Sequence, residues 1–464
     1  MKKVALHNLG CKVNSYEYDV MQQNLQKNGF EIVPFSEKAD VYIVNTCSVT
    51  NIADRKSRQM LHRAKTLNPE ALVVATGCYV QTGTETLKED PYVDLLVSNN
   101  RKSGIADIIL KALSASKEGT APALVKKQCS DLIEINDPVP YEKMQLEDTT
   151  EKTRATIKIQ DGCNQFCSYC IIPFARGRVR SRSPQDIFAE IEALGKKGFR
   201  EFVITGIHLS SYGVDFEEKK TAIADYMVSG SRLPEVLTAI NAIPCVKRIR
   251  LGSLEPRIIT DSFLEALKGC DKLCPHFHLS LQSACNETLT RMNRHYTIED
   301  YEARVAKIRE VFPRAAITTD VIVGFPGETG EEFQKTYSRL QSLKLYEIHV
   351  FKYSKRKGTR AAVMPDQVAD TVKESRSNLL LDLTAEQSAA FRATFIGKPV
   401  EVLLEEEKII DGVAYLCGYT REYVYAALPV EETGTDGNGI PGGICGCVGR
   451  KMADSGKVLI VSRV

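Results

Sequence analysis

Three cysteines within eight residues carry the clearest chemical signal in the sequence. Cys163, Cys167 and Cys170 are spaced C-x3-C-x2-C, and an aromatic residue, Tyr169, stands just before the last of them. Thiolates this close together suit one metal centre better than three separate roles. Closed zinc and iron–sulfur sites use four protein ligands, so a site with three leaves one coordination position open for chemistry. The spacing by itself is compatible with zinc as well as with an iron–sulfur cluster.

Three more cysteines each follow a predicted strand in the N-terminal third of the chain. The strand–cysteine pairs are residues 2–8 with Cys11, residues 41–46 with Cys47 and residues 71–76 with Cys78. Strands that alternate with helices form a parallel sheet, and the loops after such strands open at one edge, where ligands bind. We therefore expect these cysteines to converge on a second three-thiolate site. The alternative is that they are small buried residues in tight turns.

The elements around these cysteines define an N-terminal domain. Helices are predicted between the strands, and a strand near 92–97 and a helix over 103–115 complete the alternation. Residues 1–115 should therefore form an α/β domain with a parallel sheet. Residues 116–148 lose this periodicity and are predicted to be a linker that wraps between domains.

A second, longer alternation of strands and helices follows the linker. The predicted strands are 156–160, 201–206, 247–253, 276–282, 316–324 and 346–354. Six β/α units favour a partial (β/α)6 barrel, whose active face lies at the C-terminal ends of the strands. The triple cysteine follows the first of these strands and so belongs to that face. We assign residues 149–382 to this central domain.

A run of arginines follows the triple cysteine with a period of two. Arg176, Arg178, Arg180 and Arg182 would share one face of an extended segment. One interpretation is a charged edge exposed to solvent. Beside an active-site loop, however, four guanidinium groups favour contact with phosphate. Charge alone does not decide between an RNA substrate and an anionic group of a cofactor.

The C-terminal segment has a different composition, with short alternating strands that begin at Pro399. Residues 383–464 are predicted to form a small all-β barrel of the OB type. Residues 390–464 contain eight Lys and Arg against ten Asp and Glu, so the segment is not basic overall. Contact with RNA would then depend on chosen residues, such as Arg421 and the tyrosines around it.

Overall composition excludes several classes of protein. Of the 464 residues, 43% are hydrophobic and 26% are charged, which is typical of a globular protein with several domains. The net charge is +2, so nucleic-acid binding needs a local patch. No apolar run reaches the length of a membrane span, and fourteen cysteines without a secretion signal favour metal ligation in a reducing cytosol. We expect a cytoplasmic monomer.

The cysteine loop and its six β/α units resemble the radical SAM superfamily. The resemblance implies that Cys163, Cys167 and Cys170 hold a 4Fe–4S cluster, which binds and cleaves S-adenosylmethionine to a 5′-deoxyadenosyl radical. It also implies contacts with that cofactor near the strand ends. The residues implied are Tyr169, Thr205, Gly206, Ser253, Glu255, Gln282, Val321 and Val323. For each of them singly, ordinary strand-end polarity or packing is at least as good an explanation.

The order of the three domains and the two cysteine triads together resemble the methylthiotransferase family. The resemblance implies that Cys11, Cys47 and Cys78 hold an auxiliary 4Fe–4S cluster, and that the C-terminal barrel is an RNA-binding TRAM domain. It further implies that two molecules of S-adenosylmethionine are used per turnover. One methylates a sulfur, and the other provides the radical for transfer of the methylthio group to carbon. All six cysteines would then be catalytic.

The substrate expected from this resemblance is tRNA. The segments Leu9-Gly-Cys-Lys-Val-Asn14 and 205–213 are similar to the MtaB-type branch, which modifies C2 of N6-threonylcarbamoyladenosine at tRNA position 37. The alternative substrates are N6-isopentenyladenosine in tRNA and an aspartate of a ribosomal protein, whose branches usually carry different residues around the first cysteine. A non-catalytic iron–sulfur RNA-binding protein, or a radical SAM methylase without sulfur insertion, would each leave part of the pattern unexplained. The sequence does not identify the electron donor or the sulfur source.

Overall fold

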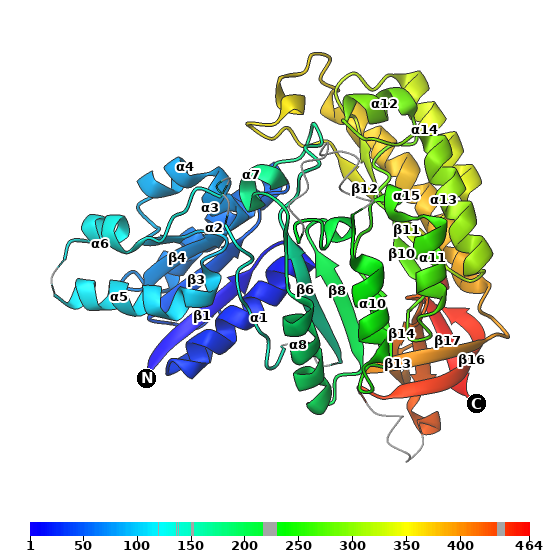
Figure 1. The fold of residues 1–464 in the computed structure, drawn as a ribbon, viewed down its shortest axis with the longest axis horizontal. Coiled ribbons are helices and arrows are strands. Elements are labelled where there is room, and N and C mark those ends of the chain that lie inside the picture. The colour runs from blue at the N-terminus through cyan, green and yellow to red at the C-terminus, as the bar shows by residue number, and fades with distance from the viewer. Residues whose placement is uncertain (119, 136, 138, 150–152, 217–229, 434–440) are drawn as a thin grey trace.

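The computed structural model describes residues 1–118, 120–135, 137, 139–149, 153–216, 230–433 and 441–464, arranged in three units (Figure 1). The N-terminal unit contains a five-stranded parallel sheet in the order β2-β1-β3-β4-β5. Its strands are β1 (Lys2–Asn8), β2 (Phe30–Val33), β3 (Val41–Thr46), β4 (Leu72–Gly77) and β5 (Leu95–Val97). The strand order reverses at β1 and β3, and ligands bind at such a switch point in open α/β sheets. Only the short edge strand β2 was not predicted from the sequence.

Helices cover both faces of this sheet. They are α1 (Lys12–Lys27), α2 (Asn51–Leu67), α3 (Cys78–Thr82), α4 (Thr84–Glu89) and α5 (Ile105–Lys117). The segment predicted as a linker carries one helix, α6 (Pro122–Cys129), whose Val125 and Cys129 pack in the N-terminal core. Met144 and Leu146, further along, pack in the central core. The segment therefore touches both domains; positions 119, 136 and 138 lie outside the described residues.

The central unit has the six parallel strands that the sequence predicts. They are β6 (Arg154–Asp161), β8 (Glu201–Gly206), β9 (Arg248–Leu251), β10 (His276–His278), β11 (Ala316–Val323) and β12 (Glu347–Lys352). Strands β6, β8 and β9 form one ladder and β10, β11 and β12 another, joined by the bridge between Leu254 and Leu279. The result is a partial barrel, which α1 of the N-terminal unit flanks beside β6 (Figure 1). A two-residue strand, β7 (Arg180–Ser181), pairs antiparallel with β6.

Alternate strand residues face an outer layer of helices and form the main core. The helices are α7 (Ile172–Arg176), α8 (Pro184–Lys196), α10 (Leu233–Ala242), α11 (Asp261–Lys268), α12 (Asn286–Arg291), α13 (Ile298–Val311), α14 (Gly330–Leu343) and α15 (Asp370–Ala393). The predicted boundary between residues 382 and 383 falls inside α15, whose Leu380 and Leu383 both pack in the central core. We therefore place the boundary after α15, because a continuous helix packs as one body.

The C-terminal unit is a closed five-stranded barrel in the order β13-β14-β15-β17-β16. Its strands are β13 (Pro399–Ile410), β14 (Val413–Thr420), β15 (Tyr425–Pro429), β16 (Ile444–Ala453) and β17 (Val458–Arg463). The predicted all-β barrel is thus confirmed. It packs against the N-terminal ends of the central strands, whereas the loop with Cys163, Cys167 and Cys170 follows the C-terminal end of β6 (Figure 1).

Buried charges join the C-terminal barrel to the central one. Arg248 and Arg250 on β9 are fully buried, and both pair with Glu201 on β8 at 3.3 and 2.8 Å. Their remaining N–H groups donate to backbone carbonyls of Glu401 and Thr420 in the C-terminal unit. Arg248 also pairs with the carboxylate of Glu401 at 2.8 Å, so Glu201 is the carboxylate common to the two cations that dock this unit.

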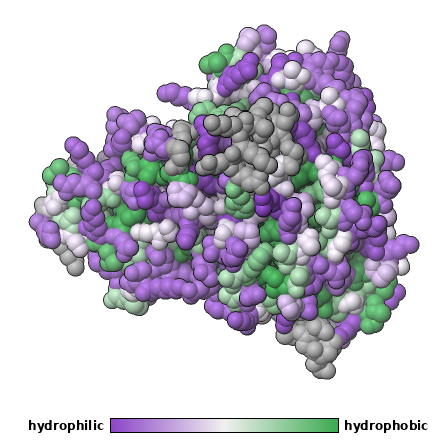
Figure 2. Space-filling view, viewed as in Figure 1, coloured by the Kyte–Doolittle hydropathy of each residue, from purple (hydrophilic) through white to green (hydrophobic). Residues whose placement is uncertain are grey.

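None of the described helices is both long and apolar enough to cross a bilayer. On the face seen in Figure 2, hydrophilic residues surround separate apolar patches.

Candidate active site between two cysteine clusters

The three N-terminal cysteines lie at one edge of the sheet, as their positions in the sequence predict. Cys11 precedes α1, Cys47 follows β3 and Cys78 begins α3. Burial raises the pKa of Cys47 to about 11, and the nearby thiols of Cys78 and Cys11 contribute to that rise. A Cβ on Gly10 would lie 3.1 Å from the sulfur of Cys47, so the loops after β1 and β3 are in contact.

The close approach of these loops requires glycine beside the cysteines. Gly77 has a φ of +95°, and a Cβ there would stand only 2.4 Å from the carbonyl oxygen of Thr46. Gly10, with a φ of +110°, is equally restricted. The Gly-Cys pairs at 10–11 and 77–78 therefore serve to bring the sulfurs together.

The second triad lies in the loop after β6. Burial raises the pKa of Cys163 to about 12, with a further contribution from Cys167, and the same two effects raise the pKa of Cys170. The backbone N–H of Gln165 points at the sulfur of Cys163 at 3.5 Å. Phe166 adopts a φ of +50° between the first two cysteines, a conformation that is uncommon for a bulky residue. The backbone of the loop therefore turns around the sulfur of Cys163.

One arginine donates to a sulfur in each triad. The Nε of Arg176 lies 3.4 Å from the sulfur of Cys78, and Nη1 of Arg294 lies 3.3 Å from the sulfur of Cys167. The sequence pattern placed Arg176 with the RNA contacts and gave no sign of Arg294, since nothing local marks it. Donors of this kind favour thiolates and stabilise anionic clusters.

The donor set fits a 4Fe–4S cluster at each triad. Within the described ranges, no three Cys, His, Asp or Glu side chains close around a single metal ion. Thiolates that hold a multi-iron cluster bind different irons and so stand further apart. Three thiolates would leave one iron of a 4Fe–4S cluster bound there without a protein ligand.

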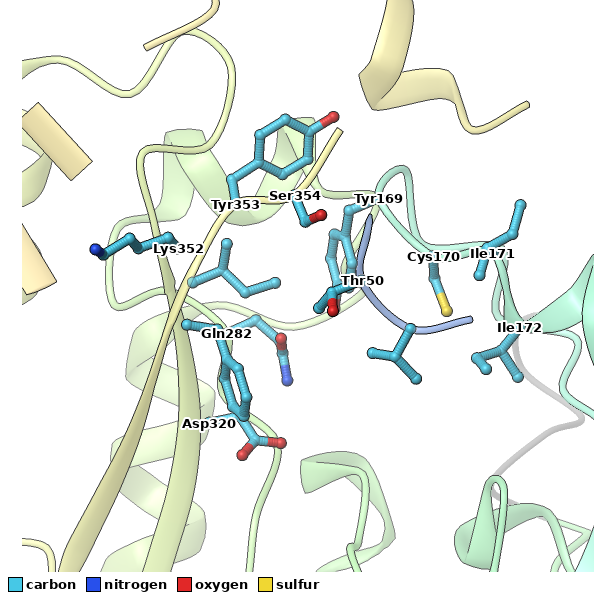
Figure 3. Close-up of a pocket in the computed structure, with 13 residues that line it drawn as sticks. Thr50, Tyr169, Cys170, Ile171, Ile172, Gln282, Asp320, Lys352, Tyr353 and Ser354 are labelled. Carbon is cyan, nitrogen blue, oxygen red and sulfur yellow. The ribbon is translucent and has the colours of Figure 1, made fainter. Parts of the chain in front are cut away.

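A cavity of about 190 Å³ is lined by Cys170 of the second triad and by the segment that follows Cys47 of the N-terminal triad (Figure 3). Val49 and Thr50, which follow Cys47, line it on one side, and Tyr169 and Cys170 line it on another. Gln282 enters from the end of β10, with its side chain near Tyr169 (Figure 3). Segments next to both triads, distant in sequence, therefore line one cavity.

The residues expected to bind S-adenosylmethionine differ in where the structure places them. Thr205 lies on the inner face of β8, because its neighbour Ile204 packs in the outer core. Glu255 is buried, and its charge acts on Cys163 and Arg294, which places it beside the second triad. Gly206 packs against Gln160, whereas Ser253 is exposed.

Val321 and Val323 were expected to contact S-adenosylmethionine, and this prediction is wrong for their side chains. Both are fully buried in the helix-facing core. Because strand residues alternate between faces, Asp320 and Ile322 line the cavity instead.

Several buried polar atoms near the second triad lack a partner among the described residues. They include Nε2 of Gln165, Oγ of Ser168 and Nε2 of His208. Burial, with the charge of Arg294 second, lowers the pKa of His208 to about 3, so this ring is neutral. Unpaired buried polar atoms are costly, and a polar cofactor bound here would satisfy them. His208 lies within the segment 205–213, whose sequence is similar to the MtaB-type branch.

The arginine run does not form the exposed face that its period predicts. Arg176 ends the short helix α7, and Arg176, Arg180 and Arg182 are buried in ion pairs, the last with Glu190. Only Arg178 of this run is exposed, with its guanidinium 4.7 Å from the ring centre of Phe166. The three buried arginines are therefore unavailable to RNA phosphates, and this prediction is corrected.

Arg421 is likewise engaged at a domain contact. Its Nη2 donates to the carbonyl of Leu273 at 2.7 Å. Tyr419 and Tyr423 stack on each other with ring centres 4.5 Å apart, and Arg154 and Arg250 pack over the ring of Tyr423. These side chains bind the C-terminal barrel to the central one and do not present a free RNA surface.

Comparison with known proteins agrees with this geometry. Residues 3–98 match the family described as Uncharacterized protein family UPF0004, and residues 157–340 match the Radical SAM superfamily. The threonylcarbamoyladenosine tRNA methylthiotransferase MtaB of Bacillus subtilis is 39% identical over 91% of this chain and 90% of its own. The protein of the same name from Thermotoga maritima is 37% identical over 91% of each chain.

This chain belongs to the radical SAM tRNA methylthiotransferases. The family also contains the tRNA-2-methylthio-N(6)-dimethylallyladenosine synthase of Clostridium botulinum, 36% identical over 85% of this chain and 84% of its own. Members of the family use S-adenosylmethionine and 4Fe–4S clusters. Among solved structures, the radical S-adenosylmethionine methyltransferase TsrM of Kitasatospora setae has a similar fold. Its TM-score is 0.55 at 18% identity, over 78% of this chain and 77% of that one.

In this methylthiotransferase, the arrangement of protein groups determines where the chemistry takes place. When bound, the clusters supply the electron that cleaves S-adenosylmethionine and a sulfur that is methylated and transferred. The chain positions one triad in the loop after β6 and the other at the sheet edge, and the cavity is lined by Cys170 of the first of these and by Val49 and Thr50 next to the other. Tyr169, Ile322 and Phe351 give this cavity apolar walls, which limits the access of water to a reactive radical.

Proposed function

We propose that this chain adds a methylthio group to C2 of N6-threonylcarbamoyladenosine in tRNA. The observation that carries the proposal is that one cavity is lined both by Cys170 of one triad and by the loop that follows Cys47 of the other. A radical SAM methylase without sulfur insertion would need only the triad of Cys163, Cys167 and Cys170. The choice of base is supported by the MtaB relatives from Bacillus subtilis and Thermotoga maritima.

The six cysteines are assigned as cluster ligands in this proposal. Thr205, Glu255, Gln282 and His208 are assigned to S-adenosylmethionine, since they lie at the strand ends around the second triad. A cytoplasmic monomer that takes electrons from an external donor fits a tRNA-modifying role. The experiment that tests the function is methylthiolation of defined tRNAs by the reconstituted chain, and its design closes the Discussion.

A basic loop at the cavity rim is a better candidate for RNA contact than the buried arginine run. The loop after β12 carries Lys355, Lys357 and Arg360, all exposed and, among the described residues, without an ion pair. Its neighbour Ser354 lines the cavity. Phosphates of an anticodon loop placed over the cavity would lie within reach of these cations.

The basic loop is anchored to the N-terminal domain. Between its exposed cations, the buried Arg356 pairs with Asp54 at 2.7 Å and donates to Ser48 Oγ at 2.9 Å. Asn51 donates its backbone N–H to Ser354 and its side-chain amide to the carbonyl of Lys355. The loop is thus held over the segment that follows Cys47.

Replacing Lys355, Lys357 and Arg360 together by alanine should raise KM for tRNA several-fold and leave kcat nearly unchanged. The change removes cations that bind phosphate, not groups at the reacting atoms. The slope of log KM against log salt concentration should become shallower by roughly 0.7–0.9 for each phosphate that the variant no longer neutralises. Steady-state kinetics over a salt series measures both effects. A control triple variant at Lys268, Lys307 and Lys335 on the outer helices should behave as wild type. An unchanged KM and salt slope in the loop variant would remove this surface from the RNA interface.

A further inference from the structure

Arg176 lies at the centre of a buried charge network between the N-terminal and central domains. Its guanidinium hydrogen-bonds both carboxylate oxygens of Glu17 on α1, and it also donates to Asn14 on the same helix. Its Nη1 lies 3.3 Å from the carboxylate of Asp161, at the end of β6. Its Nε, the remaining donor, points at the sulfur of Cys78 at 3.4 Å. The side chain is entirely inaccessible to solvent.

The protein groups of this network do not balance in charge. Lys102, Lys158 and Arg180 join Arg176, which gives four cations. The carboxylates that pair with them are Glu17 and Asp161, which leaves a surplus of two positive charges. Buried ions are costly unless they are paired.

The remaining charge points to an anion beside Cys78. A further buried carboxyl, Glu142, feels the charges of Lys158 and Lys102, but burial raises its pKa. Even with Glu142 ionised, one positive charge stays uncompensated. Burial also lowers the pKa of Lys102, and the charges that oppose this are those of Glu17 and Cys78. A cluster held by three thiolates next to Arg176 would supply the missing negative charge.

The position of Arg176 also links the two triads. Cys78 is a ligand candidate of the N-terminal triad, and Asp161 stands two residues before Cys163, the first cysteine of the other. We propose that Arg176 is a positioning residue that neutralises the auxiliary cluster at Cys78 and ties it to the loop of the radical SAM cluster. The inference rests on a cluster at Cys11, Cys47 and Cys78 and not on the choice of RNA substrate.

Two consequences follow for a protein that carries this cluster. A cation and an N–H donor next to a cluster stabilise its reduced, more negative form, so Arg176 raises the reduction potential. Loading of the cluster supplies the counter-charge for the network, so it also stabilises the contact between the two domains.

The reduction potential is tested in a protein whose second triad is changed to alanine, so that only the auxiliary cluster is present. A redox titration monitored by electron paramagnetic resonance gives its midpoint in wild-type, Arg176→Lys and Arg176→Met backgrounds. We expect the midpoint to become more negative in the order wild type, Lys, Met. Arg182→Met removes an equally buried arginine that pairs with Glu190 and lies away from the sulfurs, so it should leave the midpoint unchanged. If Arg176→Met does not retain its cluster, a lower midpoint in Arg176→Lys supports the proposal. Equal midpoints in wild type and both Arg176 variants overturn the proposal. If only Arg176→Lys retains its cluster, a midpoint equal to that of wild type overturns it.

Thermal unfolding separates this role from a purely structural one. In the same background, the loaded wild-type protein should unfold at a higher temperature than the cluster-free protein. Arg176→Met should narrow that gap, because the variant has less surplus charge for the cluster to neutralise. Equal losses of stability in the loaded and cluster-free forms would mean that Arg176 only holds the domains together, and would contradict the proposal. Both measurements are independent of RNA, so a failure of the proposed substrate leaves them intact.

Discussion

Cys78→Ala is expected to reduce methylthio transfer to background while cleavage of S-adenosylmethionine continues. Cys78 belongs to the sheet-edge triad, whereas the loop of Cys163, Cys167 and Cys170 remains complete in the variant. Chromatography of 5′-deoxyadenosine measures cleavage of S-adenosylmethionine, and mass spectrometry of tRNA nucleosides measures methylthio transfer. The loss should exceed the tenfold to hundredfold losses typical of residues that only support a metal ligand.

Two further variants serve as controls for this experiment. Cys129→Ala removes a cysteine that is buried in the N-terminal core, and both reactions should persist. Cys167→Ala should abolish both reactions, since the radical can no longer form. Methylthio transfer by Cys78→Ala at a rate near wild type would exclude the auxiliary cluster from the reaction.

Glu201→Ala is expected to destabilise the contact between the central and C-terminal barrels by roughly 3–5 kcal/mol. The change leaves the buried Arg250 without a carboxylate partner, and it leaves the buried Arg248 with only the more exposed Glu401. Chemical denaturation monitored by circular dichroism measures the loss. Glu302→Ala, which breaks an ion pair with Arg339 near the surface, should cost about 1 kcal/mol or less. A similarly small cost for Glu201→Ala would show that the two arginines do not depend on this carboxylate.

The same carboxylate makes stability depend on pH. Burial works to raise the pKa of Glu201, but the charge and hydrogen bond of Arg250, with Arg248, prevail and lower it to about 2. The folded pKa lies below the ordinary value of 4.5, so the contribution is fully present above pH 4.5. It is lost as the pH falls towards about 2. The variant should lose this part of the acid sensitivity.

The fold and the cysteine clusters could be predicted because their signals are local. Each strand of the N-terminal sheet except β2 contains at least three consecutive apolar residues, and parallel strands place their following loops at one edge. Cys11, Cys47 and Cys78 therefore converge for a topological reason. Strand β2 has only four residues, and its burial depends on α1 and β1, so no local pattern marks it.

The remainder of the site depends on contacts between distant segments. The period of Arg176 to Arg182 indicated a strand, but its first residue ends a helix, and its partners Glu17 and Asn14 lie in another domain. Val321 and Val323 were expected to contact S-adenosylmethionine, although strand alternation turns both side chains towards the helices. Arg294 and His208 show their roles only once the barrel brings them to the second triad.

Methylthiolation of defined tRNAs by the anaerobically reconstituted chain tests the central claim most directly. Three tRNA samples are compared, with N6-threonylcarbamoyladenosine, N6-dimethylallyladenosine or unmodified adenosine at the same position, each with S-adenosylmethionine and a chemical reductant. Nucleosides from each reaction are then analysed by mass spectrometry. We predict that threonylcarbamoyladenosine alone gains the mass of one methylthio group in place of one hydrogen. Modification of the dimethylallyl nucleoside in its place would contradict the proposed substrate, and no methylthiolation of any sample would contradict the function itself.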